Sequence, residues 1–176
     1  RSQNYFKYIT MKQQIIKEIH EWMETFVEKS NPKFGNMPPC PYARQARLQN
    51  KIDIKDLDDD YLVCLVDAAR TWTDEFDVVI FVETIVDRYD PSELSAIVEE
   101  VNKRVMPMDI VCLEDHPAEP EIINGVQMNN GKYVLVLMQR LSKINDASKH
   151  LESTSYYKHW TKENLDDVKN WRFEKD

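Results

Sequence analysis

A cysteine set between prolines is the residue in this chain best placed to do chemistry. It lies in the segment Pro38-Pro39-Cys40-Pro41, just ahead of a short run that suits a helix. If Cys40 is the N-cap and Pro41 the first helical residue, the N–H groups of Tyr42 and Ala43 point at the sulfur. Helix N-termini lower a thiol pKa, so the loop predicts a reactive thiolate. A small buried cysteine with a structural role is the alternative.

Other polar residues could complete an active site around this thiol. His116 is the candidate general acid or base, and Glu114 or Asp115 would orient its imidazole. Planar guanidinium groups would bind a carboxylate or phosphate on the substrate. The candidate arginines are Arg44, Arg47 and Arg140. A small anionic metabolite is therefore the expected substrate, although a solvated loop histidine would explain His116 equally well.

Glu83 and Asp115 are further candidates for binding a substrate. Glu83 ends the apolar run Val78–Val82, and α/β proteins place their ligands at the ends of such strands. Asp90 stands ahead of Pro91 and is better explained as a helix cap. The sequence has no Cys-x-x-Cys, His-x-x-x-His or His-Glu-x-x-His pattern, so we expect neither a metal nor a cofactor. Cys40 with His116 and a nearby acid is the weaker metal-binding alternative.

Composition limits the classes of function. The chain has 176 residues, a net charge of −8 and a pI near 5.1, which argues against nucleic acid as a partner. No run approaches the roughly 18 apolar residues of a membrane span, and no secretory signal is visible. Three widely spaced cysteines suit a reducing compartment. We therefore expect a cytoplasmic protein without membrane contact, with a homo-oligomer or a protein partner left open.

Alternating helical and strand patterns indicate one α/β domain. The expected helices cover residues 11–29, 40–49, 61–72, 90–106 and 141–151, and the expected strands cover 51–55, 77–83, 109–113 and 133–138. This order predicts right-handed parallel crossovers, with the last two strands antiparallel. The result would be a mixed sheet of about four strands with extra helices at both ends, and an α+β arrangement is the alternative.

The domain limits follow from the same patterns. Residues 1–10 precede Met11 and are interpreted as an N-terminal extension or a remnant of expression. Residues 11–155 form the single domain. Residues 156–176, which contain His159, Trp160, Leu165, Val168 and Trp171, are expected to form a helical tail that packs on it.

Two resemblances bear on the cysteine loop. Cys40-Pro41-Tyr42 is locally similar to the active-site loop of glutaredoxins, whose second cysteine is replaced here by Ala43 and whose preceding strand is missing. This departure excludes a two-cysteine redox cycle. A single redox thiol remains compatible with the loop.

The wider resemblance covers about residues 16 to 147. Trp22, the loop Cys40-Pro41-Tyr42-Ala43, the strand through Glu83, His116-Pro117 and a strand ending at Arg140 resemble a bacterial domain family of unknown function. That family has a Trp-containing helix, a Cys-Pro-Phe-Ala loop and a later His-Pro segment preceded by phenylalanine, where this chain has Asp115. The resemblance implies that Cys40, His116 and Arg140 belong together, but it implies no reaction.

Two hypotheses follow. The first is a small enzyme that uses Cys40 as nucleophile or redox thiol on an anionic substrate. The second is a non-catalytic interaction or accessory protein in which the Cys40 loop has only a structural role.

Overall fold

The computed structural model describes residues 2–174 and has a four-stranded mixed sheet at its centre, in the order β1-β2-β6-β3. The strands are β1 (Ile52–Asp56), β2 (Val78–Glu83), β3 (Ile110–Asp115) and β6 (Val134–Arg140). β1 and β2 are parallel, while β6 runs antiparallel to both β2 and β3. The expected α/β class, the strand number and the antiparallel final pair are confirmed. β6 is the last strand in the chain but lies inside the sheet.

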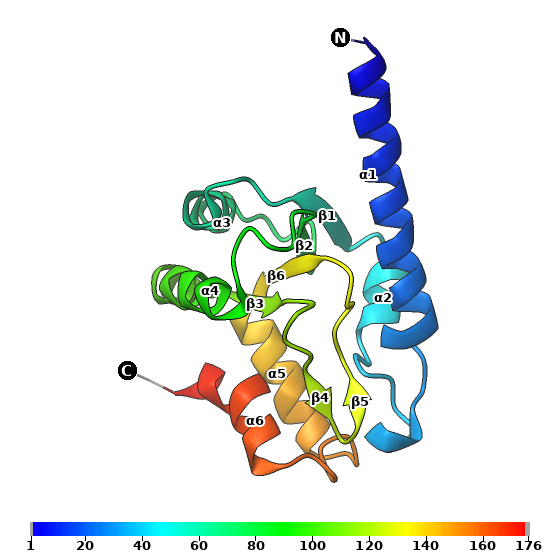
Figure 1. The fold of residues 1–176 in the computed structure, drawn as a ribbon. Helices are drawn as coiled ribbons and strands as arrows, with labels where there is room; N and C mark the ends of the chain where they lie inside the picture. Colours follow the sequence, from blue (N-terminus) through cyan, green and yellow to red (C-terminus); the bar gives the residue numbers. More distant parts are fainter. Residues whose placement is uncertain (1, 175–176) are drawn as a thin grey trace.

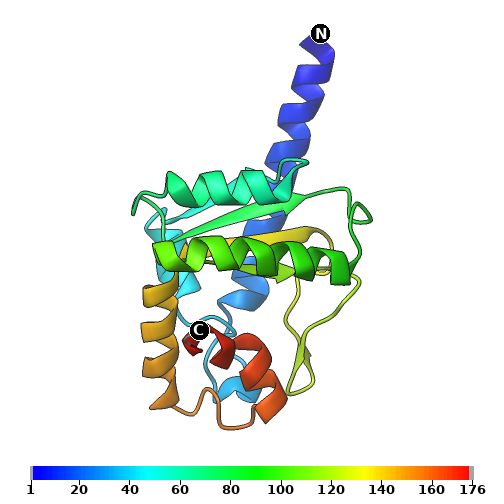
Figure 2. The same ribbon diagram turned by 90° about the vertical axis from the view of Figure 1, so that its left-hand side faces the viewer.

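Two helices cover one face of this sheet: α3 (Tyr61–Arg70) and α4 (Pro91–Val105), which lie side by side in Figure 2. They occupy the same face because both crossovers, β1 to β2 and β2 to β3, advance across the sheet in the same direction with the same hand. The first turn of α4 is fixed by a capping box between Asp90 and Glu93, as the sequence predicts for Asp90.

The opposite face is covered by α1 (Ser2–Trp22) and α2 (Ala43–Leu48), with a π-helical turn (Met23–Val27) continuing α1. Ile15 and Ile19 of α1 pack in one apolar cluster with Ile80 and Leu135. Only the second half of α1 lies on the body, and its first turns project away from it, as Figure 1 shows. α1 passes residue 11 without a break.

Beyond the end of the sheet, α5 (Leu141–Glu152), α6 (Lys162–Val168) and 3-10 turns at Pro32–Phe34 and Asn170–Phe173 form a second, aromatic packing region. Its buried residues are Phe34, Ile123, Leu151, Tyr156 and Trp160. Another 3-10 turn, Met106–Met108, joins α4 to β3. Residues after 155 therefore share a second core with Phe34, Ile123 and Leu151.

The structure adds a hairpin that the sequence patterns did not predict. β4 (Ile122–Ile123) and β5 (Val126–Gln127) pair in antiparallel fashion, and each has only two residues. Asn124 and Gly125 form the turn, both with positive φ (50° and 78°), which is typical of a two-residue hairpin turn. Strands this short show no alternation to detect. Among residues 2–174, no helix has the length and apolarity needed to cross a bilayer.

Candidate functional site

The Cys40 loop is held by hydrogen bonds from two parts of the chain. The Cys40 N–H donates to the carbonyl of Val27 at 3.0 Å, and the Tyr156 hydroxyl donates to the carbonyl of Pro39. α2 begins only at Ala43, so its N-cap is Tyr42 and not Cys40. The loop thus joins the end of α1 to the aromatic region around Tyr156.

The thiol of Cys40 has a raised pKa, opposite in direction to the sequence-based prediction. Cys40 is exposed to solvent, but protein atoms crowd its sulfur, and this loss of hydration is the largest cause of the raised pKa. The N–H groups of Tyr42 and Ala43 do donate toward the sulfur and lower the pKa, as expected, and the carboxylate of Glu28 raises it again. The loop therefore favours the neutral thiol.

The nearby arginines do not reverse this balance. The guanidinium of Arg47 donates to both oxygens of Glu28, at 2.6 and 3.0 Å, and also pairs with Glu24 at 3.0 Å. These two carboxylates hold the Arg47 guanidinium against the π-helical turn that continues α1. Arg44 is exposed on α2, one turn before Arg47. Arg47 therefore joins α2 to α1, a structural contact that the sequence patterns missed because Glu28 lies 19 residues earlier.

His116 is buried, with 6% of its surface exposed, and both ring nitrogens are occupied. Ala118 N–H donates to Nδ1 at 3.0 Å, so the proton sits on Nε2, which donates to the carbonyl of Tyr89 at 3.0 Å. The imidazole thus links the loop after β3 to the loop before α4. None of these partners is shared with Cys40.

Arg140 and His116 lie at opposite ends of the β3–β6 strand pair. In the register of β3 with β6, Arg140 is opposite Ile110, whereas Asp115 is opposite Leu135. Five residues of strand separate these positions, which corresponds to roughly 17 Å. Arg140 instead pairs with both oxygens of Asp74, at 2.8 and 3.3 Å, and this pair lowers the pKa of Asp74. The structure therefore does not bring His116 and Arg140 together.

Glu83 is a buried carboxylate at the end of β2, and three donors occupy it. Tyr61 hydroxyl lies at 2.9 Å, Arg88 Nε at 2.8 Å and Ile85 N–H at 2.8 Å. Arg88 also pairs with Asp59 at 3.1 Å. Burial and the hydrogen bond to Glu83 raise the pKa of Tyr61. Glu83 thus fastens the loops at this edge of the sheet and offers no free oxygen to a substrate.

Asp115 lines a hollow of about 710 Å³ beside His116. Its carboxylate accepts from the Asn129 side chain at 2.9 Å and from Asn130 N–H at 3.1 Å. The hollow is strongly acidic. Its acidic lining residues are Glu114, Asp115, Glu119, Glu121, Glu163 and Asp167. A hollow with this lining repels the anionic substrate that the sequence predicted for His116 and Asp115.

The same hollow raises the pKa of several of its carboxyl groups. Burial is the largest cause for Glu114, Asp115 and Glu121, and neighbouring carboxylates add to it at Glu114 and Glu121. Within residues 2–174, no group of three or more histidine, cysteine or acidic side chains is arranged to hold a metal ion.

The predicted site residues are therefore distributed among separate structural contacts. Cys40 contacts the π-helical turn after α1, and His116 and Asp115 lie beside the acidic hollow. Arg140 lies at the opposite end of the β3–β6 strand pair. Comparison with protein-family models, with curated proteins and with solved structures found no match for this chain. The resemblance to the Cys-Pro-Phe-Ala family stays a prediction.

Proposed function

We propose that this chain is a non-catalytic interaction protein in which the Cys40 loop has a structural role. The observation that supports this proposal is the state of the candidate catalytic groups. The pKa of Cys40 is raised, and both nitrogens of His116 are engaged by backbone partners. A nucleophile needs a thiolate and a base needs a free nitrogen, so these two groups lack the properties that catalysis requires.

A second line of support is the apolar surface that the chain exposes. Within residues 2–174, the most exposed large apolar side chains are Tyr5 and Phe6 of α1, at 65% and 68%. Two adjacent aromatic side chains held on a projecting helix resemble a protein contact more than a solvated surface.

The reactivity of Cys40 tests the proposal. In a Cys64→Ser background, we expect the rate of Cys40 alkylation to rise with a midpoint above the roughly 8.5 of a free cysteine, because crowding disfavours the thiolate. Cys112 does not interfere, since burial raises its pKa to about 12. The measurement is the pH profile of iodoacetamide labelling, read by mass spectrometry.

The same protein unfolded in urea is the matched control and should show the ordinary midpoint. A folded midpoint of about 7 or lower would identify an activated thiolate and refute the non-catalytic proposal. Loss of a measured activity on Cys40→Ser would refute it as well.

A further inference from the structure

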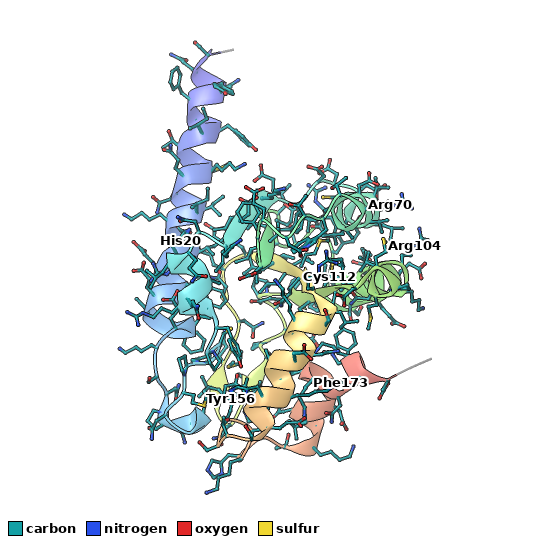
Figure 3. All side chains as sticks on the ribbon, turned by 180° about the vertical axis from the view of Figure 1, so that it is seen from behind. His20, Arg70, Arg104, Cys112, Tyr156 and Phe173 are labelled. Atoms are coloured by element: carbon teal, nitrogen blue, oxygen red, sulfur yellow. The ribbon has the colours of Figure 1, made fainter. Side chains whose placement is uncertain are left out.

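α1 carries an apolar stripe that the body of the molecule covers only in part. At 100° per residue, Tyr5, Ile9 and Ile16 follow one line along the helix, and Phe6 flanks it. Tyr5 and Phe6 are exposed, while Ile9 and Ile16 are half-buried. Figure 3 shows the side chains of these first turns standing clear of the sheet and of the other helices.

One flank of this stripe carries charges of both signs. Lys12 lies about 60° around the helix from Ile9 and pairs with Asp56 at the end of β1, at 3.6 Å. Asp56 opens the acidic loop, residues 56–60, which contains four aspartates. Asp58 of this loop lies close enough to Tyr8 to help raise its pKa. The acidic loop therefore stands beside the stripe.

The charge of α1 itself is opposite to that of the rest of the chain. Residues 2–17 contain three lysines and no acid, whereas the whole chain carries −8. A cationic helix segment beside an acidic loop forms a self-complementary surface. Such a surface suits a two-fold contact, in which each patch meets its own copy.

We propose that the stripe of Tyr5, Phe6, Ile9 and Ile16 binds a second copy of this chain, with the two α1 helices crossing in antiparallel orientation. This inference rests on the proposed function, and it names the partner. The crossing brings Lys12 of each copy to the acidic loop of the other and covers the aromatic side chains. An anionic membrane would match the lysines but would be repelled by the acidic loop.

The area of the stripe sets the strength of the dimer. Two two-thirds-exposed aromatic rings and two half-buried isoleucines offer on the order of 400 Å² per copy. A standard interface buries about 800 Å² per partner, and weak transient ones bury less. We therefore expect a weak and reversible dimer.

The test is sedimentation equilibrium of the full chain from about 1 to 200 μM. Wild type should dimerise, and Phe6→Asp and Ile9→Asp should each raise the dissociation constant at least about tenfold. Met11→Asp is the matched control. Met11 is an exposed apolar residue of the same helix, about 160° around from Ile9, so this variant should dimerise like wild type. Circular dichroism confirms that each variant is folded.

A charge exchange tests the orientation. Lys12→Glu alone and Asp58→Lys alone should each weaken the dimer, whereas an equimolar mixture should recover it, because both contacts of the mixed dimer again pair opposite charges. A wild-type chain that stays monomeric at 200 μM would overturn the proposal, as would a dimer unaffected by Phe6→Asp. If the protein stays monomeric and binds phosphatidylserine vesicles, the partner of the stripe is an anionic membrane and not a second copy, and the proposal is overturned. None of these outcomes changes the Cys40 labelling midpoint, so the two proposals fail separately.

Discussion

Glu121 shows how the acidic hollow acts on stability at the level of one residue. Loss of hydration in the hollow is the largest cause of the raised pKa of Glu121, and the carboxylates of Asp115, Asp167 and Glu114 add to it, although part of the residue stays exposed to solvent. Ionisation of Glu121 therefore costs stability as the pH rises through its folded pKa, and the cost vanishes below its ordinary value. We predict that Glu121→Gln raises the melting temperature by about 1–3 °C at pH 7.

The gain should disappear near pH 3, where most glutamate is protonated in both the folded and the unfolded state. Thermal melts at pH 3 and pH 7 measure the difference. Glu75→Gln, an exposed position outside the hollow, is the control and should change neither melt. A gain of equal size at both pH values would show that the charged form of Glu121 is not the cause.

At this scale, sequence reasoning identified groups but not their partners. It placed His116 in a loop and Arg47 in a short helix, and it foresaw the N–H groups of Tyr42 and Ala43 at the sulfur of Cys40, but it began that helix at Cys40 and not at Ala43. It could not foresee the partners of these groups. The contacts from Glu28 to Arg47 and from Tyr89 to His116 span 19 and 27 residues, and local patterns carry no signal for them.

Among the elements, β3 depends on a side chain from α4. β3 is an edge strand, and the amide of Asn102 donates to the carbonyl of Cys112 at 2.9 Å and accepts from its N–H at 2.8 Å. The side chain thus takes the place of a further strand. We predict that Asn102→Leu lowers the free energy of unfolding by about 2–4 kcal/mol, because it leaves two buried backbone groups unpaired.

Urea unfolding followed by tryptophan fluorescence measures this loss. Lys103→Leu changes the next, exposed residue of α4 and should stay within about 0.5 kcal/mol of wild type. A loss under about 1 kcal/mol for Asn102→Leu would show that water replaces the amide.

The elements themselves were largely predictable because their periodicity is strong. The apolar runs of β2 and β3 and the stripes of α3, α4 and α5 have a period that the sequence displays directly. The π-helical turn after Trp22 and the β4–β5 hairpin were not predictable. The π-helical turn differs from an α-helix mainly in its hydrogen-bond spacing, which the sequence pattern does not display. The hairpin has only two residues in each strand.

Over the whole molecule, the last helices are attached through a buried arginine. Arg172 donates to the Ser148 hydroxyl at 2.9 Å, but within residues 2–174 its Nε and Nη1 have no partner, and burial lowers its pKa. A buried charge without a counter-charge costs stability. We predict that Arg172→Met raises the free energy of unfolding by roughly 1–2 kcal/mol, measured by urea unfolding.

Lys169→Met is the matched control. Lys169 is buried in the same segment but pairs with Glu152 at 2.6 Å, so its loss should destabilise the protein. If both methionine variants destabilise equally, the hydrogen bond from Arg172 to Ser148 outweighs the cost of burying its charge.

The position of β6 between β2 and β3 has a consequence for biosynthesis. β2 and β3 leave the ribosome before the strand that separates them, and the sheet cannot close until residue 140 has followed. At about 5–20 residues per second, the 25 residues from the end of β3 to the end of β6 take roughly one to five seconds. During that interval the edges of β2 and β3 that later pair with β6 have no partner strand. The four-stranded sheet is complete only when β6 occupies the place between them.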